Sequence, residues 1–202
     1  MQSVGLLLLA AGASTRLGRP KQLLPYHERT LLRHAAEIAA ASGCQPLVLV
    51  TGALHEELLP EVAGQPFEVI RNEAWTEGMG SSIRVGMAAL KKLTAPENPL
   101  LAVLLMLCDQ PLLTADHLRQ LLARQRATGV LAVASAYAGT LGVPVVFGAP
   151  LFAQLSKLTG AKGAGPLLAS LRPEEVERVD FPDGVMDVDT AEQYQQLLNH
   201  GS

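Results

Sequence analysis

The segment LLLLAAGASTRLGRPK, residues 6–21, decides which fold and which chemistry this sequence favours. Its apolar first half is typical of a buried β-strand, which we expect over residues 4–9. Alanine and glycine follow, and such small residues form a loop whose backbone a ligand can approach closely. The N–H groups of such a loop can hold phosphates, and Arg16, Arg19 and Lys21 add positive charge within six residues. A nucleoside triphosphate site is therefore expected here, with an ordinary strand-to-helix loop as the alternative.

Strand and helix patterns alternate along the rest of the chain, which predicts βαβ units and a mostly parallel sheet with helices on both faces. We expect one three-layer α/β domain over residues 1–202, because we find no repeat, linker or low-complexity tract. The unbroken apolar run at residues 100–107 is the expected central strand, and Pro144 places the strand at 143–147 at an edge or a bulge. The other expected strands cover residues 46–50, 67–70, 130–136 and 176–180, and the expected helices cover residues 30–42, 54–59, 81–93, 114–127, 151–158, 164–171 and 190–198.

The composition limits the classes of partner. The 202 residues carry a formal charge of −3, so the local cations indicate a small anion and not a nucleic acid or an acidic membrane. The chain is 49% apolar, yet no run reaches the roughly 18 apolar residues of a membrane span, and no positive residue precedes the first apolar run as in a signal peptide. We therefore expect a cytoplasmic protein, in which Cys44 and Cys108 are reduced, buried thiols.

Carboxylates stand at two further points of the chain. Asp109 comes directly after the apolar run of the central strand, at the end where open α/β sheets bind ligands. Asp187 and Asp189 lie two residues apart in an extended segment, so they face the same side; we expect Asp187 to be a metal ligand and Asp189 a helix cap or a supporting group. Such hard oxygen ligands suit Mg²⁺ that bridges phosphates. The alternatives are a turn residue ahead of Pro111 and a pair that only caps the terminal helix.

A third loop, residues 72–84 (NEAWTEGMGSSIR), follows a strand and ends in the start of a helix. Its glycines allow close backbone approach, and the two serines that follow offer hydroxyl and N–H groups. This combination suits recognition of a base or a ribose, with a capped helix after an ordinary turn as the alternative. We expect Trp75, the single tryptophan, to be a packing residue rather than a stacking platform.

Several other classes of protein lack their signatures in this sequence. The first loop matches neither the Walker A motif nor the Gly-x-Gly-x-x-Gly fingerprint of dinucleotide binding, which disfavours hydride transfer. A Gly-x-Ser-x-Gly nucleophile elbow is missing, His34 lies within an expected helix, and no cluster of Cys and His has zinc spacing. A non-catalytic module that binds a nucleotide or a partner stays open as a second class of function.

These pieces, in this order and at this spacing, resemble the MobA-like nucleotidyltransferases, and within them the molybdenum cofactor cytidylyltransferases. The resemblance covers nearly the whole chain and implies a Rossmann-like, three-layer αβα nucleotidyltransferase fold. It also implies a Mg²⁺-dependent transfer of a nucleoside monophosphate to a phosphorylated acceptor such as molybdopterin, with release of pyrophosphate. The matching stretches are LAAGASTRLGRPKQLL at residues 9–24, Asn72 with GMGSSI at 78–83, DQP at 109–111 and DVDT at 187–190.

The family pattern assigns roles to the matching positions. Arg16 and Lys21 would hold the triphosphate and, with Asp109, form the catalytic set, while Asp109 and Asp187 would bind Mg²⁺. The step Ala10-Ala11-Gly12 is similar to the cytidylyl branch and favours CTP, since the guanylyl branch usually has two glycines there. A molybdoenzyme or its chaperone is the implied protein partner. The implied nucleotide-binding residues are Leu9, Ala10, Ala11, Gly12, Arg16, Lys21, Asn72, Gly80, Ser81 and Ser82.

The second half of the chain departs from the family pattern. The family often has His, Asp and Arg at three positions where this chain has Val143, Ala161 and Gly165. Because we expect these segments to shape the acceptor side, nucleotide transfer is better supported than a molybdopterin acceptor. Lys162 is either a partial replacement for the lost positive charge or a solvated loop lysine. Guanylyl transfer, or transfer to a sugar phosphate or a phospholactate, is the neighbouring alternative.

Overall fold

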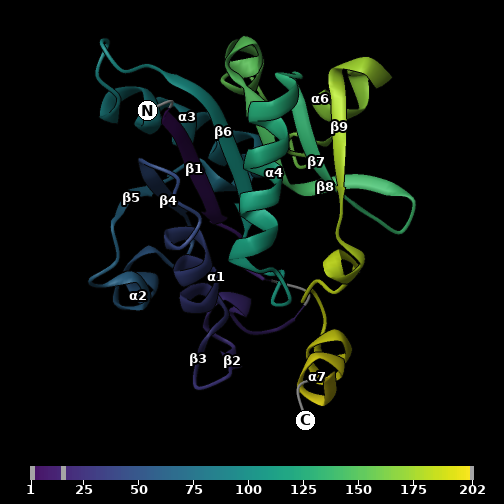
Figure 1. Cartoon of the computed structure of the whole chain (residues 1–202). Helices are drawn as coiled ribbons and strands as arrows, with labels where there is room; N and C mark the ends of the chain where they lie inside the picture. The colour runs from purple at the N-terminus through teal and green to yellow at the C-terminus, as the bar shows by residue number, and fades with distance from the viewer. Residues whose placement is uncertain (1–2, 15–16, 201–202) are drawn as a thin grey trace.

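The structure is a computed structural model and describes residues 3–14 and 17–200 (Figure 1). Its centre is a seven-stranded sheet with the strand order β5-β4-β1-β6-β8-β7-β9, and a separate hairpin pairs β2 with β3. The strands are β1 (Ser3–Ala10), β2 (Pro25–Tyr26), β3 (Arg29–Thr30), β4 (Leu47–Thr51), β5 (Phe67–Arg71), β6 (Leu100–Leu107), β7 (Ala132–Tyr137), β8 (Thr140–Gly148) and β9 (Val176–Asp180). The α-helices are α1 (Leu31–Ala40), α2 (His55–Leu58), α3 (Met79–Leu93), α4 (Ala115–Thr128), α5 (Phe152–Leu155), α6 (Gly165–Ser170) and α7 (Ala191–His200).

The central sheet is mostly parallel, as predicted. β1 pairs in parallel with β4 and β6, β4 pairs in parallel with β5, and β7 pairs in parallel with β9. Only β8 runs antiparallel to its two neighbours in this sheet. The carboxyl ends of β1, β4 and β6 therefore meet at one edge, which is where open α/β sheets bind their ligands.

Two hydrophobic cores cover the two faces of the sheet. Leu6 and Leu8 of β1 face the core that α1 and α4 complete, whereas Leu7 and Leu9 face the core that α3, α5 and α6 complete. Successive side chains of a strand point to opposite faces, so a strand that is buried on both faces needs an unbroken apolar run. This explains the leucine run of the first strand and confirms the three-layer αβα architecture (Figure 1).

A third, smaller core attaches the C-terminal segment to the segment that follows the first loop. Tyr26 and Leu31 pack with Val188, Tyr194 and Leu197 in this core. The Tyr194 hydroxyl also donates a hydrogen bond to the Pro25 carbonyl oxygen, at 2.7 Å. Figure 1 shows α7 and the β2–β3 hairpin at the same end of the molecule, beyond the edge of the central sheet.

Pro144 lies in β8, an interior strand, so the expectation of an edge strand is wrong and that of a bulge is confirmed. Val143 and Pro144 are extra residues of β8 at a register shift opposite Ala134 and Ser135 of β7. A bulge leaves its extra residue outside the ladder, and a proline has no N–H to offer there. Gln110 Nε2 donates to the Val143 carbonyl oxygen at 3.0 Å, which ties the bulge to the end of β6.

The helix expected at residues 151–158 is shorter than predicted. A 3₁₀ turn at Ala149–Leu151 precedes the single α-helical turn of α5. The chain leaves the helix early because residues 159–163 pack against the start of α3: the Gly80 N–H donates to the Gly160 carbonyl oxygen at 3.0 Å. The sequence pattern of residues 151–158 has helical spacing but carries no trace of this distant contact.

Both cysteines are free and buried, as expected. Burial raises the pKa of the Cys44 thiol, which is therefore protonated at neutral pH. Within residues 3–14 and 17–200, none of the helices combines the length and the apolar character that crossing a bilayer requires.

Candidate active site

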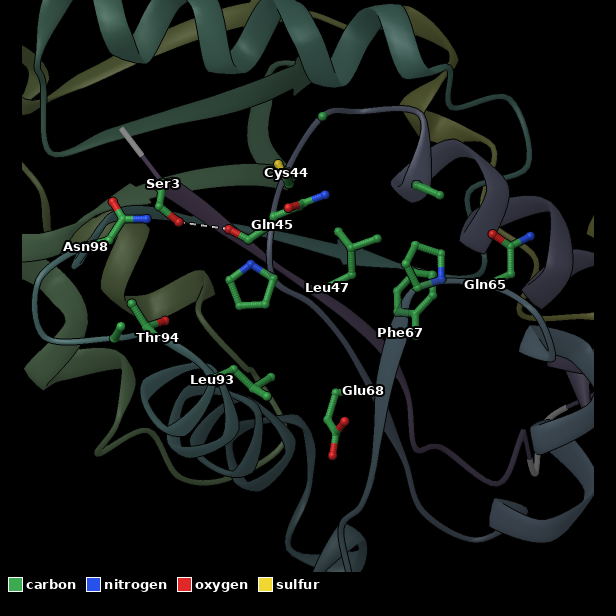
Figure 2. Close-up of a pocket in the computed structure, with 15 residues that line it drawn as sticks. Ser3, Cys44, Gln45, Leu47, Gln65, Phe67, Glu68, Leu93, Thr94 and Asn98 are labelled. Carbon is green, nitrogen blue, oxygen red and sulfur yellow. Dashed lines mark hydrogen bonds between the residues drawn. The ribbon is translucent and has the colours of Figure 1, made fainter. Parts of the chain in front are cut away.

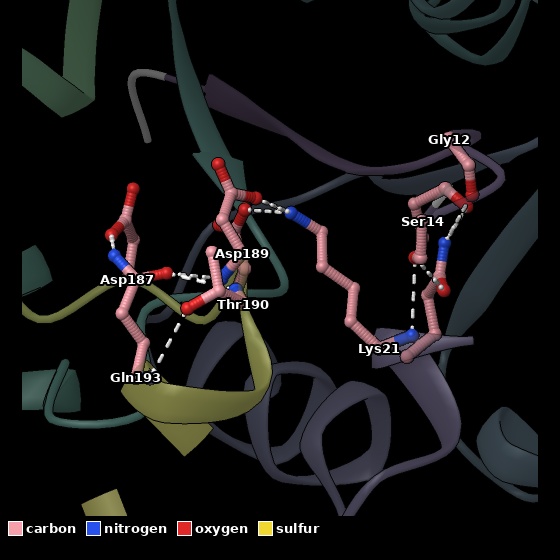
Figure 3. Close-up of polar contacts among 10 residues, drawn as sticks. Gly12, Ser14, Lys21, Asp187, Asp189, Thr190 and Gln193 are labelled. Atoms are coloured by element: carbon pink, nitrogen blue, oxygen red, sulfur yellow. Dashed lines mark hydrogen bonds and ion pairs between the residues drawn. The ribbon is translucent and has the colours of Figure 1, made fainter. Parts of the chain in front are cut away.

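Lys21 joins three distant parts of the chain at the carboxyl edge of the sheet. It lies on a 3₁₀ turn, Lys21–Leu23, that follows the first loop. Its ammonium donates to Asp109 Oδ2 at 2.5 Å and to Asp189 Oδ1 at 2.7 Å (Figure 3). The Val188 N–H donates to the Asp109 carbonyl oxygen at 3.1 Å, and this bond brings the last carboxylates to the end of β6. The predicted meeting of the first loop with Asp109 and residues 187–190 is therefore present in the fold.

The two last carboxylates have different partners. Asp189 pairs with Lys21, whereas Asp187 Oδ1 accepts a hydrogen bond from Gln193 Nε2 at 2.8 Å. Of the two roles expected for Asp189, a helix cap or a supporting group, its contact with Lys21 fits the second, and the Thr190 hydroxyl accepts from the Gln193 N–H at the start of the terminal helix, at 3.3 Å. Asp189 therefore belongs to the charged cluster.

The cluster holds more negative than positive charge among the described residues. Burial alone would lower the pKa of Lys21, but Asp109 and Asp189 outweigh it and hold that pKa above its ordinary value. Burial, and then the charges of Asp189 and Asp109, raise the pKa of Asp187. Three carboxylates thus lie near one described ammonium, which contacts two of them, and this surplus of negative charge favours the approach of a further cation.

Asp109 offers an oxygen for such a cation. Its Oδ1 atom is buried and has no hydrogen-bond partner in the part of the chain that the structure describes. No group of three or more Asp, Glu, His or Cys side chains in residues 3–14 and 17–200 is arranged to hold an ion by itself. Mg²⁺ is usually bound by one or two carboxylates together with substrate phosphates. The residues present therefore fit an ion that arrives with a triphosphate better than an ion held by protein alone.

A cavity of about 320 Å³ lies between the first loop and the start of α3. Lys21 and Asp109 line it, and Trp75, Met79 and Ala161 contribute the apolar part of its wall. Of the predicted nucleotide-binding residues, Leu9, Ala10, Ala11, Gly12, Lys21 and Ser82 line this cavity. Arg16 lies outside the described residues.

Asn72 and Ser81 lie behind the wall of this cavity. They are 1% and 0% exposed, and Asn72 Nδ2 donates to Ser81 Oγ at 2.8 Å and to Ser82 Oγ at 3.0 Å. Asn72 Oδ1 accepts from the Ala74 N–H at 3.0 Å. Their polar groups hold residues 74–82 in place, so any part in nucleotide binding acts through the shape of that loop. Gly80 likewise packs against Thr159, where a Cβ would lie 2.7 Å from the Thr159 carbonyl carbon.

Two features of the wall were not predicted from the sequence. Trp75 packs against Gly52, as expected of a packing residue, but it also lines the cavity. Gly78 has a φ of 102°, and a Cβ there would lie 2.7 Å from the Ala161 Cα, so a larger residue would push the wall apart. Ala161 itself, one of the departures from the family pattern, faces the cavity.

Arg19 is directed to the terminal helix and not to the lysine cluster. Its guanidinium lies 5.0 Å from the centroid of the Tyr194 ring, a cation–π contact that links the first loop to α7. A larger hollow of about 690 Å³ lies at the amino ends of the parallel strands, around Cys44, Phe67 and Leu93 (Figure 2). Glu68 is the one charged side chain among its described lining residues, so this hollow offers no positively charged side chain to a triphosphate.

A mostly parallel sheet with a small-residue loop, a lysine and carboxylates at its carboxyl edge defines an α/β protein built to bind nucleotides. The family described as MobA-like NTP transferase domain matches residues 6–176. The chain belongs to this family of nucleotidyltransferases.

Known relatives span almost the whole chain. A nicotine blue oxidoreductase of Paenarthrobacter nicotinovorans is 36% identical and covers 95% of both chains. A molybdenum cofactor cytidylyltransferase of Escherichia coli K12 is 25% identical and covers 96% of this chain and 95% of its own. The crystal structure of Rv0371c from Mycobacterium tuberculosis H37Rv is 31% identical, covers 98% of both chains and superposes with a TM-score of 0.80. A further structure of that protein is a complex with manganese, with 30% identity, a TM-score of 0.76 and coverage of 98% of this chain and 99% of that one.

Proposed function

We propose that this nucleotidyltransferase moves CMP from CTP to a small phosphorylated acceptor, with release of pyrophosphate and dependence on Mg²⁺. The observation that carries the proposal is the ammonium of Lys21, held by Asp109 and Asp189 at the wall of a cavity that the first loop also lines. A lysine beside carboxylates at the edge of a nucleotide-sized cavity can bind phosphates and neutralise charge. Family membership supports nucleotide transfer as the reaction class.

In the proposed reaction, an acceptor phosphate attacks the α-phosphorus of the nucleotide and pyrophosphate leaves. The acceptor needs no general base, because the second pKa of a phosphate monoester is about 6 and its dianion is abundant at neutral pH. Such transfers need positioning and charge neutralisation above all. Lys21 would contact the α-phosphate and the departing pyrophosphate, and we assign the same task to Arg16 from the family pattern.

Asp109 and Asp187 are the proposed Mg²⁺ ligands. Two observations on the described residues support this assignment: Asp109 Oδ1 is buried without a hydrogen-bond partner among them, and they place more carboxylates than ammonium groups around Lys21. The manganese complex of Rv0371c supports a divalent cation in a relative of this chain. When bound, Mg²⁺ would polarise the phosphates and offset their developing charge. Asp189 would keep its separate task of holding Lys21 in position.

CTP and a molybdopterin-type acceptor are the more specific parts of the proposal. Ala10-Ala11-Gly12 and the similarity to a cytidylyltransferase of E. coli support CTP. The same relative supports a molybdenum cofactor as acceptor, and the family resemblance implies a molybdoenzyme or its chaperone as recipient. Val143, Ala161 and Gly165, which replace the family's polar residues, weigh instead toward a different phosphorylated acceptor. Guanylyl transfer is the neighbouring proposal.

An oxidoreductase is the second candidate function, because the 36% identical relative is named a nicotine blue oxidoreductase. The lack of a Gly-x-Gly-x-x-Gly fingerprint in the first loop argues against a dinucleotide donor. The two candidates are separable by one pair of assays: pyrophosphate release from a triphosphate, and oxidation of NADH or NADPH with nicotine blue as acceptor.

The single tryptophan offers a direct binding test, since Trp75 lines the cavity. We expect its fluorescence to change on addition of CTP with Mg²⁺, and to change less with GTP, ATP or UTP at equal concentration. Lys21→Met should weaken this binding. Lys92 is an exposed lysine of α3, so Lys92→Met should leave the binding unchanged. Equal responses to all four nucleotides would refute the cytidine preference, and no response to any would refute nucleotide transfer.

A further inference from the structure

Gln22 is a buried polar residue that the chemistry of transfer does not use. It follows Lys21 on the 3₁₀ turn and is 1% exposed. Its Nε2 donates to the Ala10 carbonyl oxygen at 3.1 Å and to the Gly12 carbonyl oxygen at 2.7 Å. The side-chain amide group of Gln22 therefore donates both of its hydrogens to backbone carbonyls of the first loop. A buried amide with this geometry is expensive to replace, because each lost partner leaves a carbonyl unpaired.

The other end of the amide holds Ser14. Ser14 Oγ donates to Gln22 Oε1 at 3.1 Å, and the same hydroxyl accepts from the Lys21 N–H at 3.1 Å (Figure 3). Ser14 has a φ of 54°, a left-handed conformation that residues other than glycine rarely adopt. The hydroxyl bonds therefore hold a strained point of the loop and connect it directly to the backbone of Lys21.

These bonds also fix the direction of the loop's N–H groups. In a planar trans peptide the C=O and the following N–H point in opposite directions. Because the Ala10 and Gly12 oxygens are turned to Gln22, the N–H groups of Ala11 and Ala13 are turned away from it. N–H groups that a loop holds in fixed directions can bind phosphates.

We propose that Gln22 is the positioning residue of the phosphate site: it orients the N–H groups of the first loop and fixes their position relative to the Lys21 ammonium. This inference rests on the proposed function, because it assumes that the loop receives the triphosphate. Gln22 acts through the backbone of the loop and does not take part in the chemical step. Its loss should weaken binding of the phosphate part of a nucleotide while the fold persists.

Gln22→Glu tests the proposal, because the protonation state of the introduced carboxyl, and with it the ability to donate a hydrogen bond, changes with pH. An ionised carboxylate cannot donate to the two carbonyls and is repelled by them, whereas a protonated carboxyl can donate one of the two bonds. The side-chain contacts of Gln22 named above are uncharged. Among the described residues, Lys21 and Asp109 are the charged groups that line the same cavity as Gln22, and they pair with each other. At about pH 8 we expect the Kd for CTP and for inorganic tripolyphosphate, each with Mg²⁺, to rise about tenfold or more.

At about pH 5.5 the ratio of variant to wild-type Kd should fall back to within roughly threefold, because burial raises the pKa of the introduced carboxyl. Gln22→Met, which has no donor at any pH, should show the loss at both pH values. Gln125→Glu is the matched control, because Gln125 on α4 also donates to a backbone carbonyl, that of Val130, at 3.3 Å. This change should leave the ratio of variant to wild-type Kd near one at both pH values. Trp75 fluorescence reports binding in all four proteins.

A Gln22→Glu ratio within twofold of one at pH 8, or a loss that does not change with pH, would overturn the proposal. Should that variant fail to fold, Ser14→Ala takes its place: it removes the hydroxyl shared by Gln22 and Lys21 and should raise both Kd values several-fold, and unchanged values would overturn the proposal equally. Failure of the wild-type protein to bind either ligand would instead refute the proposed function. Binding by wild type and equal binding by the variants would refute the role of Gln22 alone.

Discussion

Replacing Lys21 by methionine keeps the length and apolar stem of the side chain but leaves Asp109 and Asp189 without their ammonium. The lysine side chain is 17% exposed, and the two carboxylates are 11% and 23% exposed, so solvent screens their repulsion only in part. Removing one partner of a buried ion pair costs roughly 3–5 kcal/mol. Because this cluster keeps some contact with water, we expect a loss near the lower limit, about 3 kcal/mol, in the free energy of unfolding.

A loss of this size lowers the melting temperature of a domain of this length by roughly 6–12 °C. Thermal unfolding followed by circular dichroism measures it, with Lys92→Met as the control. Millimolar MgCl₂ should recover more stability in the Lys21 variant than in the wild type, because the vacated carboxylates then bind the ion. Turnover should stay at least about a hundredfold lower even with Mg²⁺, since a positioned charge at the phosphates is lost. A variant as stable as the wild type without Mg²⁺ would refute the electrostatic account of the cluster, and normal turnover would remove Lys21 from the mechanism.

Three further predictions concern other parts of the molecule. Asp109→Asn should abolish Mg²⁺-dependent pyrophosphate release, and turnover that persists would exclude Asp109 as the metal ligand. Burial lowers the pKa of His117, so its protonation favours the unfolded chain and the free energy of unfolding should fall as the pH drops below about 6.5. Urea denaturation between pH 7.5 and 5 measures this fall, and His117→Gln should reduce it; an unchanged slope would assign the acid sensitivity elsewhere. Gly78→Ala should lower the free energy of unfolding by roughly 2 kcal/mol or more and weaken CTP binding, because the φ of residue 78 is 102° and the added Cβ would meet Ala161. Thermal unfolding measured by calorimetry and a calorimetric titration with CTP check the two effects. A variant with wild-type stability and affinity would show that the cavity wall adjusts to the added methyl group.

The fold could be predicted largely because both faces of the sheet are buried. The leucines of residues 6–9 and the run at residues 100–107 had to be interior strands, and both are. The β2–β3 hairpin was not predicted, because each of its strands has only two residues. Its turn residues, His27 and Glu28, have φ of 44° and 63°, whereas glycine or asparagine is the usual sequence signal for a turn with positive φ.

The sequence predicted where in the fold the site residues lie, but not which side chains form hydrogen bonds or ion pairs with one another. The sequence pattern indicates different roles for Asp187 and Asp189 but does not show which of them contacts Lys21. A backbone bond from Val188 and a side-chain bond from Gln193 decide that it is Asp189. Asn72 and Ser81 have the polar atoms of ligand-binding residues, yet those atoms bond to one another and to the loop. Such pairings depend on tertiary contacts that no local pattern contains. The metal and base preferences stay predictions.

The assembly of the lysine cluster has a consequence for synthesis of the protein. Lys21 is separated from Asp109 by 88 residues and from Asp189 by 168 residues. At a ribosomal rate of roughly 5–20 residues per second, about 10–30 s pass between the emergence of the lysine and that of its second partner. The first strands and helices can form meanwhile, but the nascent chain cannot complete its charged cluster. The proposed phosphate site can therefore be completed only after residue 189 has left the ribosome and reached Lys21.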